Sequence, residues 1–269
     1  DFTEKEVAPL VKEAEETESF PRQLFTKMGD LGYLCVRYPA EYGGGDMGKV
    51  GECVAMEELS RVNAGIASTV MVQSGLATSA IDSHGSKEQK QKYLVPAVKG
   101  RKVAAFGLSE PNAGSDVASI ETKAMRDGDG YVINGNKTFI TNSPLADFVT
   151  TAAYTDKSKG PKSGMSLFIV GMDTPGLSVK KIRKLSLHSS ETGDVTYDGV
   201  RVPADNLIGE EGRGFPYVME TLAGGRIVYG ARSLGLALAA HEATVQYANN
   251  RVQFGQPIGR FQDIAFTLA

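Results

Sequence analysis

The spacing of apolar residues changes from a helical repeat to alternation near Val103, and it returns to a helical repeat after Pro203. Between these points strand signals follow one another without a helical segment between them, at residues 120–125, 131–134, 137–141, 148–154, 166–170, 177–182 and 195–202. The Asp-Gly-Asp-Gly run at 127–130 and the Asn-Gly-Asn run at 134–136 are typical of hairpin turns. Closely spaced strands of this kind predict an antiparallel barrel or sandwich.

The first hundred residues carry helical signals instead. Segments 2–18, 21–31 and 49–62 each place apolar residues on one helical face. Residues 64–81 are apolar on all sides, so we expect a buried helix there. Ser86 and Gln89 have the spacing of a capping box, which predicts a further helix running to about Val98.

The end of the chain is helical again. Residues 215–223 lead into an Ala-rich segment at 226–249, which suits a helix bundle. Residues 261–269 read as the opening of a helix without a stop signal, so we expect the C-terminus to be truncated. The first residue is Asp1, which we interpret as a sign of processing or of a fragment. The sequence therefore predicts an α+β multidomain chain with boundaries at 1–102, 103–214 and 215–269.

Composition and charge restrict the class of protein. The formal net charge of -3 provides no basic field, which argues against a nucleic-acid partner. No apolar run is expected to span a bilayer, so we predict a soluble protein without membrane insertion. The only cysteines, Cys35 and Cys53, are too few for a disulfide framework or a zinc site, which favours a reducing compartment and no metal.

The most specific short motif lies where the strand signals begin. Phe106 and Gly107 end an apolar run, and Leu108-Ser109-Glu110-Pro111-Asn112-Ala113-Gly114-Ser115-Asp116 follows. Small residues beside hydroxyl groups allow a backbone to approach a ligand closely. Oxygen-rich groups such as phosphates suit a turn of this composition.

This motif resembles the first signature of the acyl-CoA dehydrogenase family at Gly107, Leu108, Ser109, Glu110, Ala113, Gly114, Ser115 and Asp116. Further similar segments lie at 38–44, 56–61, 198–203 and 251–258, so the resemblance extends along the whole chain. The family is built from a helical domain, a middle β domain and a C-terminal four-helix bundle. That order agrees with the pattern of the segments, and only the first part of the bundle is expected here.

The resemblance implies a flavoenzyme that oxidises the Cα–Cβ bond of an acyl-CoA thioester to the 2-enoyl-CoA and passes electrons to an electron-transfer flavoprotein. FAD is the implied cofactor, and it carries the redox chemistry. The residues expected to line the flavin are Phe106, Gly107, Leu108, Ser109, Gly114 and Ser115, with Phe139, Ile140 and Thr141 as a second wall. Many relatives carry Trp at the position of Phe139, whereas this chain contains no tryptophan.

Two arginines complete the implied site. Arg251 resembles the arginine that reaches the FAD pyrophosphate of a neighbouring subunit, and a guanidinium suits phosphate oxygens. Phe254 lies in the same similar segment and is assigned to the cofactor with it. Arg226 and Ser115 are expected to contact the acyl-CoA. The resemblance thus implies a homotetramer or homodimer, in the bacterial cytoplasm or the mitochondrial matrix.

The catalytic base is expected outside this chain. Some relatives carry a catalytic glutamate just before the arginine at 226, but Gly225 stands there. The Gly-Gly-Arg form resembles short-chain members, whose glutamate lies roughly a hundred residues beyond Ala269. Glu110 and Asp116 are not assigned as bases, because the family uses their motif for cofactor geometry. We therefore expect the chain as written to bind flavin poorly and to be catalytically incomplete.

Two alternatives remain open. An acyl-CoA oxidase or a flavin monooxygenase of the same fold would deliver electrons to oxygen. Alternatively, the protein is a non-catalytic relative that serves as an assembly or binding partner. This alternative is kept because no catalytic base is identified in the chain.

Overall fold

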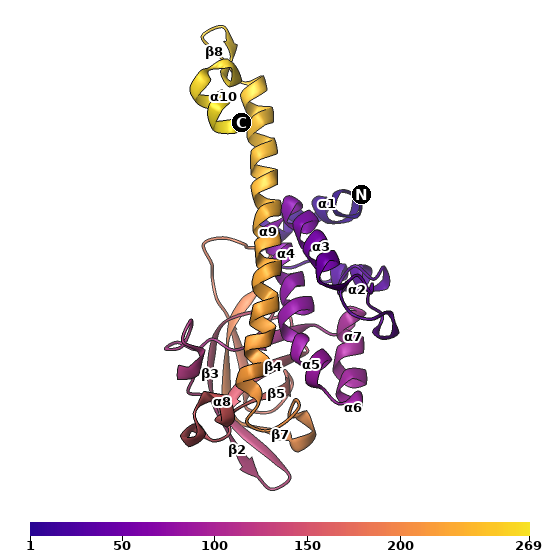
Figure 1. The fold of residues 1–269 in the computed structure, drawn as a ribbon, viewed down its shortest axis with the longest axis vertical. Helices are drawn as coiled ribbons and strands as arrows, with labels where there is room; N and C mark the ends of the chain where they lie inside the picture. The colour runs from indigo at the N-terminus through magenta and orange to yellow at the C-terminus, as the bar shows by residue number, and fades with distance from the viewer.

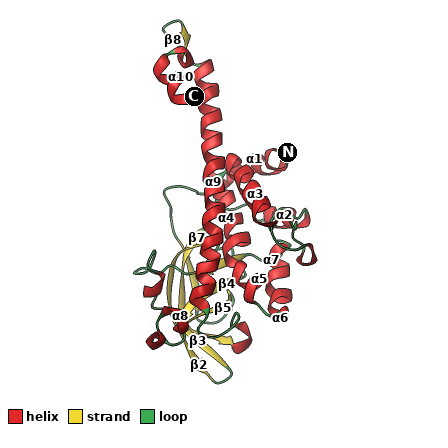
Figure 2. Cartoon of the chain, viewed as in Figure 1, coloured by secondary structure: helices red, strands yellow, loops and turns green.

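A single long helix, α9 (Gly214–Asn250), runs through the molecule (Figure 1). The computed structural model describes residues 1–269. The N-terminal helices pack against one side of α9, the β-sheet lies near its N-terminal end, and the C-terminal segment lies at its far tip. Helices, strands and helices follow one another along the chain in the expected order. Figure 2 shows most of the strands gathered at one end of the molecule. The residue boundaries of the three domains remain a prediction.

The helical part before the sheet consists of short helices with single turns between them. Its elements are η1 (Thr3–Val7), α1 (Ala8–Glu16), α2 (Gln23–Asp30), η2 (Ala40–Tyr42), α3 (Gly48–Val62), α4 (Ala64–Met71), η3 (Val72–Ala77), α5 (Ser79–His84), α6 (Lys87–Gln89), η4 (Lys90–Leu94) and α7 (Val95–Val98). The capping box is present, because Ser86 accepts from the Gln89 N–H and the Gln89 side chain accepts from the Ser86 N–H.

The helical run Ala64–His84 corrects one expectation. By length and composition it could cross a membrane, contrary to the expectation that no run is long enough. However, 83% of its most apolar window is buried inside the protein. The run is a core helix, as its uniformly apolar sequence indicates.

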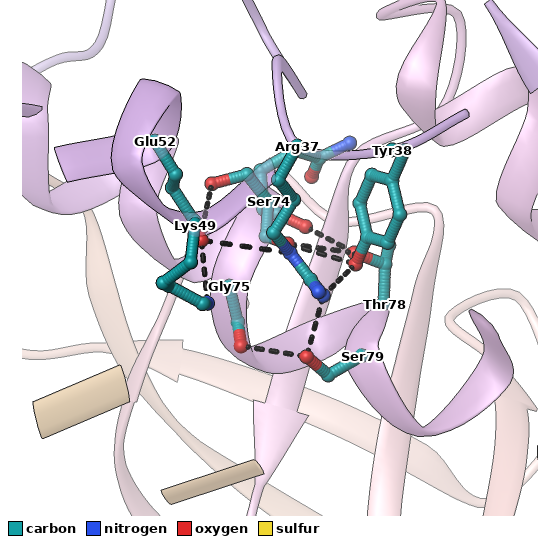
Figure 3. A network of polar contacts seen from close by, with 9 residues as sticks. Arg37, Tyr38, Lys49, Glu52, Ser74, Gly75, Thr78 and Ser79 are labelled. Atoms are coloured by element: carbon teal, nitrogen blue, oxygen red, sulfur yellow. Dashed lines mark hydrogen bonds and ion pairs between the residues drawn. The ribbon is translucent and has the colours of Figure 1, made fainter. Parts of the chain in front are cut away.

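A buried polar network braces the π-helical segment η3 of this run (Figure 3). The Glu52 carboxylate lies 2.6 Å from Lys49 Nζ and 3.6 Å from Arg37 Nε, and it accepts from Ser74 Oγ at 3.2 Å. The backbone oxygen of Ser74 accepts from Arg37 Nε at 3.1 Å and from the Tyr38 hydroxyl at 2.8 Å. Side chains from outside the helix therefore satisfy a carbonyl of the π-helical turn.

The middle part is a seven-stranded sheet with the order β1-β4-β2-β3-β7-β6, in which β5 also pairs with β4. The strands are β1 (Ala104–Gly107), β2 (Lys123–Asp127), β3 (Gly130–Thr141), β4 (Phe148–Tyr154), β5 (Met165–Gly171), β6 (Leu177–Lys181) and β7 (Thr192–Pro203). Most pairs are antiparallel, as expected, but β1 and β2 run parallel to β4, so the sheet is mixed. A parallel pair needs a long connection, and the turn and hairpin between β1 and β4 supply it.

Two local expectations in the sheet were wrong. Residues 134–136 do not form a turn, because β3 continues through them and shifts register there at Gly135. Strand β2 begins at Lys123 instead of at residue 120. The N–H groups of Glu121 and Thr122 donate to the Glu110 carboxylate, so they take no part in the ladder.

The rest of the chain connects the sheet to the tip of α9. The short helical connections between the strands and after β7 are η5 (Val117–Ser119), η6 (Lys157–Lys159), α8 (Pro161–Gly164) and η7 (Ala204–Asn206). After α9 come the two-stranded hairpin β8 (Val252–Gln253) and β9 (Gln256–Pro257), η8 (Ile258–Arg260) and α10 (Gln262–Leu268). The apolar core is continuous from the N-terminal helices to the adjoining face of the sheet, and a second cluster lies within the sheet.

Candidate functional site

A cavity of about 460 Å³ lies between the turn that follows β1 and the first turns of α9. This volume is in the range of small-molecule sites. The cavity is lined by Leu108, Ser109, Gly114, Ser115, Asp116, Val117, Ala118, Phe215, Met219, Leu222 and Arg226. The structure thus brings five residues of the expected site, Leu108, Ser109, Gly114, Ser115 and Arg226, around one space.

Backbone hydrogen bonds shape the turn on the sheet side of the cavity. Glu110 and Ala113 exchange both of their backbone hydrogen bonds, at 2.8 Å and 3.1 Å, around Pro111 and Asn112. Proline suits the first central position of such a turn because its φ is already fixed. The N–H groups of Gly114 and Ser115, which follow, donate to no backbone acceptor of the chain. Both residues are exposed, so these donors can serve a ligand.

The presence of glycine at the two positions of the motif, Gly107 and Gly114, has different physical causes. A Cβ on Gly107 would approach Val149, Tyr197 and Thr151 at 3.1–3.3 Å, so this glycine is explained by packing against β4. A Cβ on Gly114 would meet nothing within 4 Å. Internal packing therefore does not explain Gly114, whereas close approach of a ligand would.

The helix side of the cavity is a stripe that sequence reasoning missed apart from Arg226. Phe215, Met219, Leu222 and Arg226 are three or four positions apart, so they share one face of α9. This spacing was visible in the sequence. Arg226 is exposed beside the cavity, so its guanidinium is available to an anion.

The second expected wall lies on β3. Phe139 adopts φ +57° within the register shift between Lys137 and Ile140, and its side chain is 70% exposed. Positive φ is unfavourable for a bulky residue, and such strain concentrates at ligand sites. The Ile140 side chain is buried in the sheet core, so only its backbone could face a ligand. The Thr141 hydroxyl lies 3.5 Å from that of Thr192.

The two walls lie side by side, although the β3 residues do not line the cavity itself. The Thr138 N–H donates to the Ser109 oxygen at 2.9 Å. Phe106 is nearly buried as part of the core and does not line the cavity either. The β3 residues and the helix-side residues therefore both lie next to the turn at residues 108–115.

Arg251 and Phe254 lie far from this cavity, at the tip of α9 (Figure 1). Phe254 is 93% exposed in the turn between β8 and β9, with φ +53°. The chain does not bring these two residues to its own cavity. Their expected role therefore requires a second subunit, and it stays a prediction.

The carboxylates of the motif differ in availability. Glu110 Oε1 lies 2.7 Å from Lys137 Nζ and accepts from the Thr122 N–H, while Oε2 accepts from the Glu121 N–H. Both oxygens are engaged and the side chain is nearly buried, which is unsuited to proton abstraction. Asp116 is exposed and lines the cavity. No group of three or more His, Cys, Asp or Glu side chains is arranged to hold a metal ion.

Family comparisons agree with the architecture and the motif. The acyl-CoA dehydrogenase N-terminal, middle and C-terminal domain models match residues 1–101, 105–200 and 212–269. The chain belongs to the acyl-CoA dehydrogenase family. The short-chain specific acyl-CoA dehydrogenase of Clostridium acetobutylicum is 43% identical over 270 residues, covering 100% of this chain and 71% of that protein.

Solved structures support the same family. Butyryl-CoA dehydrogenase from Megasphaera elsdenii is similar with a TM-score of 0.94 and 42% identity, over 100% of this chain and 71% of that chain. A structure described as the electron transferring flavoprotein of Acidaminococcus fermentans gives a TM-score of 0.95 at 42% identity, over 99% of this chain and 70% of that chain.

Proposed function

We propose that the protein carries out FAD-dependent α,β-dehydrogenation of a short acyl-CoA thioester, giving the 2-enoyl-CoA, with electrons passed to an electron-transfer flavoprotein. One observation carries the proposal. The turn at 108–115 and Arg226 of α9, which are far apart in the sequence, line one cavity.

The residues around the turn fit a flavin dinucleotide. The free N–H groups of Gly114 and Ser115 can donate to phosphate or ring oxygens, and the open space at Gly114 permits close approach. The exposed ring of Phe139 would cover one side of the flavin, with Thr141 donating to its edge. FAD, when bound, takes up the hydride that leaves the substrate Cβ.

The cavity also fits an acyl thioester. Leu108, Phe215, Met219 and Leu222 provide an apolar lining for an acyl chain. Arg226 provides a cation for the polar CoA moiety, and Ser115 lies between the two ligands. These residues orient the Cα–Cβ bond and exclude water, but none of them is suited to take the Cα proton.

Proton abstraction is assigned to a glutamate outside residues 1–269. The residue before Arg226, where some relatives carry the catalytic glutamate, is Gly225, so this position supplies no carboxylate. Glu110 is engaged by Lys137 and two backbone donors, which supports excluding it.

The subunit arrangement and the partners are part of the proposal. The side chains of Phe254 and Arg251 are exposed just beyond the C-terminal end of α9, which favours a homodimer or homotetramer in which each tip reaches the flavin of a neighbour. The similarity to a structure described as an electron transferring flavoprotein supports such a protein as the electron acceptor. The two free cysteines suit a reducing compartment, the bacterial cytoplasm or the mitochondrial matrix.

The test uses a fusion of this chain to the remaining C-terminal length of the Clostridium acetobutylicum relative, loaded with FAD. Anaerobic addition of butyryl-CoA should bleach the visible flavin absorption. Rapid peroxide formation in the presence of oxygen would instead support the oxidase alternative. Binding of butyryl-CoA without bleaching would support the non-catalytic alternative and overturn the proposal.

A further inference from the structure

Lys137 is a fully buried lysine beside the turn, and none of the roles above uses it. Its side chain is 0% exposed. Its Nζ donates to the Leu108 backbone oxygen at 3.1 Å and to Glu110 Oε1 at 2.7 Å. Leu108 and Ser109 have left the ladder of β1 at this point, so their carbonyl groups need other partners.

These contacts fix the orientation of successive peptide groups in the turn. The Leu108 oxygen is held by Lys137, and the Ser109 oxygen is held by the Thr138 N–H. In a trans peptide the carbonyl and the following N–H point in opposite directions. Fixing the Leu108 oxygen therefore also directs the Ser109 N–H away from Lys137.

Glu110 fixes the end of the same segment. Its carboxylate accepts from the N–H groups of Glu121 and Thr122, which lead into β2. Lys137 and Glu110 thus join three segments, the turn, the entry to β2 and strand β3. The register shift that exposes Phe139 begins directly after Lys137.

Stability alone does not explain a buried ammonium group here. Burial lowers the pKa of Lys137 to about 8, although the nearby Glu110 carboxylate favours the charged form. Replacing a buried ion pair with apolar residues is often neutral or stabilising, so a packing role would not require these charges. The Leu108 carbonyl does require a hydrogen-bond donor at this place, which an apolar side chain would not supply.

We propose that Lys137 and Glu110 are positioning residues that hold the peptide groups of residues 108–110, and with them the flavin-facing wall, in the binding geometry. This inference rests on the proposed function. Neither residue touches the ligand, and both act through the backbone of the turn.

The variants are made in the fusion described above, because the chain as written is expected to bind flavin poorly. The test compares Lys137→Met, Glu110→Gln/Lys137→Met and Lys137→Arg with the unsubstituted fusion. The double variant removes both charges, so it keeps the experiment decisive if Lys137→Met fails to fold. The matched control is Arg37→Met/Glu52→Gln, which removes an ion pair between Arg37, in the segment between α2 and η2, and buried Glu52 of α3, away from the turn. Circular dichroism selects a temperature at which each variant is folded.

Three readouts are taken: the FAD dissociation constant from flavin fluorescence, the visible spectrum of the bound flavin, and hydrogen exchange of residues 108–115. We expect the FAD dissociation constant of the double variant to rise by about tenfold or more, which is the size of the loss when a group that orients a binding residue is removed. Its flavin spectrum should shift and exchange at 108–115 should rise, with partial recovery in Lys137→Arg. The control should change none of the three.

Each other outcome has a defined meaning. A folded double variant with wild-type affinity and spectrum overturns the inference and leaves the proposed function intact. The same follows if the control weakens FAD binding as much as the double variant. An unsubstituted fusion that binds no FAD at any concentration overturns the proposed function, and this inference with it.

Discussion

Gly107 and Gly114 belong to one sequence motif, yet their surroundings predict opposite effects of the same substitution. Gly114→Ala adds a methyl group in open space, so the free energy of unfolding should stay within about 1 kcal/mol of wild type. FAD or acyl-CoA affinity should fall, because the methyl group occupies the space that a ligand approaches. Chemical denaturation and ligand titration of the same preparation measure both effects.

Gly107→Ala is the matched control for that prediction. Its methyl group would crowd Val149, Tyr197 and Thr151, so we expect a loss of about 1–3 kcal/mol in stability. A Gly114→Ala variant that is destabilised as much as Gly107→Ala, but binds ligands normally, would contradict the assignment of Gly114 to the site.

The Lys137–Glu110 pair predicts a pH dependence of stability with a definite sign. Burial would raise the pKa of Glu110, but the charge and hydrogen bond of Lys137 and the backbone donors outweigh it, so the pKa is lowered. The ionised Glu110 carboxylate stabilises the folded chain at pH values above the ordinary pKa of Glu, and this stabilisation is lost as the pH falls through the pKa of Glu110 in the folded chain.

The pKa of Lys137 is lowered from 10.5 to about 8. Between these two pH values the folded chain binds fewer protons than the unfolded chain, so the free energy of unfolding rises with pH.

We therefore expect the wild type to gain stability relative to Glu110→Gln/Lys137→Met as the pH rises from about 8 to 10, by at most about 3 kcal/mol. Using the difference between the two proteins removes the contributions of other groups that titrate in this range. Urea unfolding at a series of pH values measures it. Parallel curves for the two proteins across this range would contradict the prediction.

At the scale of elements, the network around η3 predicts that Glu52 has an unusually large structural role for a glutamate on a helix. Its carboxylate is 1% exposed and contacts Lys49, Arg37 and Ser74. Glu52→Gln should lower the free energy of unfolding by about 3 kcal/mol, because it leaves two cations without their buried partner. Thermal or urea denaturation measures the loss.

Glu58 provides the comparison on the same helix. It pairs with Arg61 at the surface and is 51% exposed, so Glu58→Gln should cost only about 0.5 kcal/mol. Equal losses for Glu52→Gln and Glu58→Gln would show that the network does not brace η3.

The elements also show where sequence reasoning succeeds and where it stops. The capping box, the buried helix and β4 follow from local chemistry, and the structure contains them. The Asn-Gly-Asn run encodes a glycine with positive φ, here +150°, but such a residue suits a bulge as well as a turn. Only the pairing of β3 with β7, a partner distant in sequence, decides between them.

At the scale of the whole molecule, the site could be predicted only in part. The motif at 106–116 identified the turn, because its proline, glycines and hydroxyl residues are encoded locally. The apolar stripe of Phe215, Met219 and Leu222 was missed, because its meaning depends on α9 crossing that turn. Lys137 was missed for a similar reason, since a single lysine in a strand does not reveal that its end reaches a carbonyl of another segment.

The position of the catalytic base gives the last prediction. The chain contains the turn, the helix stripe and Arg226, and we propose that the base is a glutamate outside residues 1–269. We expect this chain, supplied with excess FAD because its flavin binding is expected to be poor, to bind butyryl-CoA without bleaching the flavin, whereas the fusion with the C-terminal length of the Clostridium acetobutylicum relative bleaches.

Asp116 is the one carboxylate lining the cavity, so it must be tested directly. If Asp116 is not the base, Asp116→Asn in the fusion should keep the bleaching rate within about tenfold of the unsubstituted fusion. Loss of a general base would instead lower the rate by about 10²–10⁴-fold. Anaerobic stopped-flow absorbance measures the rates. Bleaching by the 269-residue chain that disappears in its Asp116→Asn variant would move the base into this chain and make Asp116 the proton acceptor.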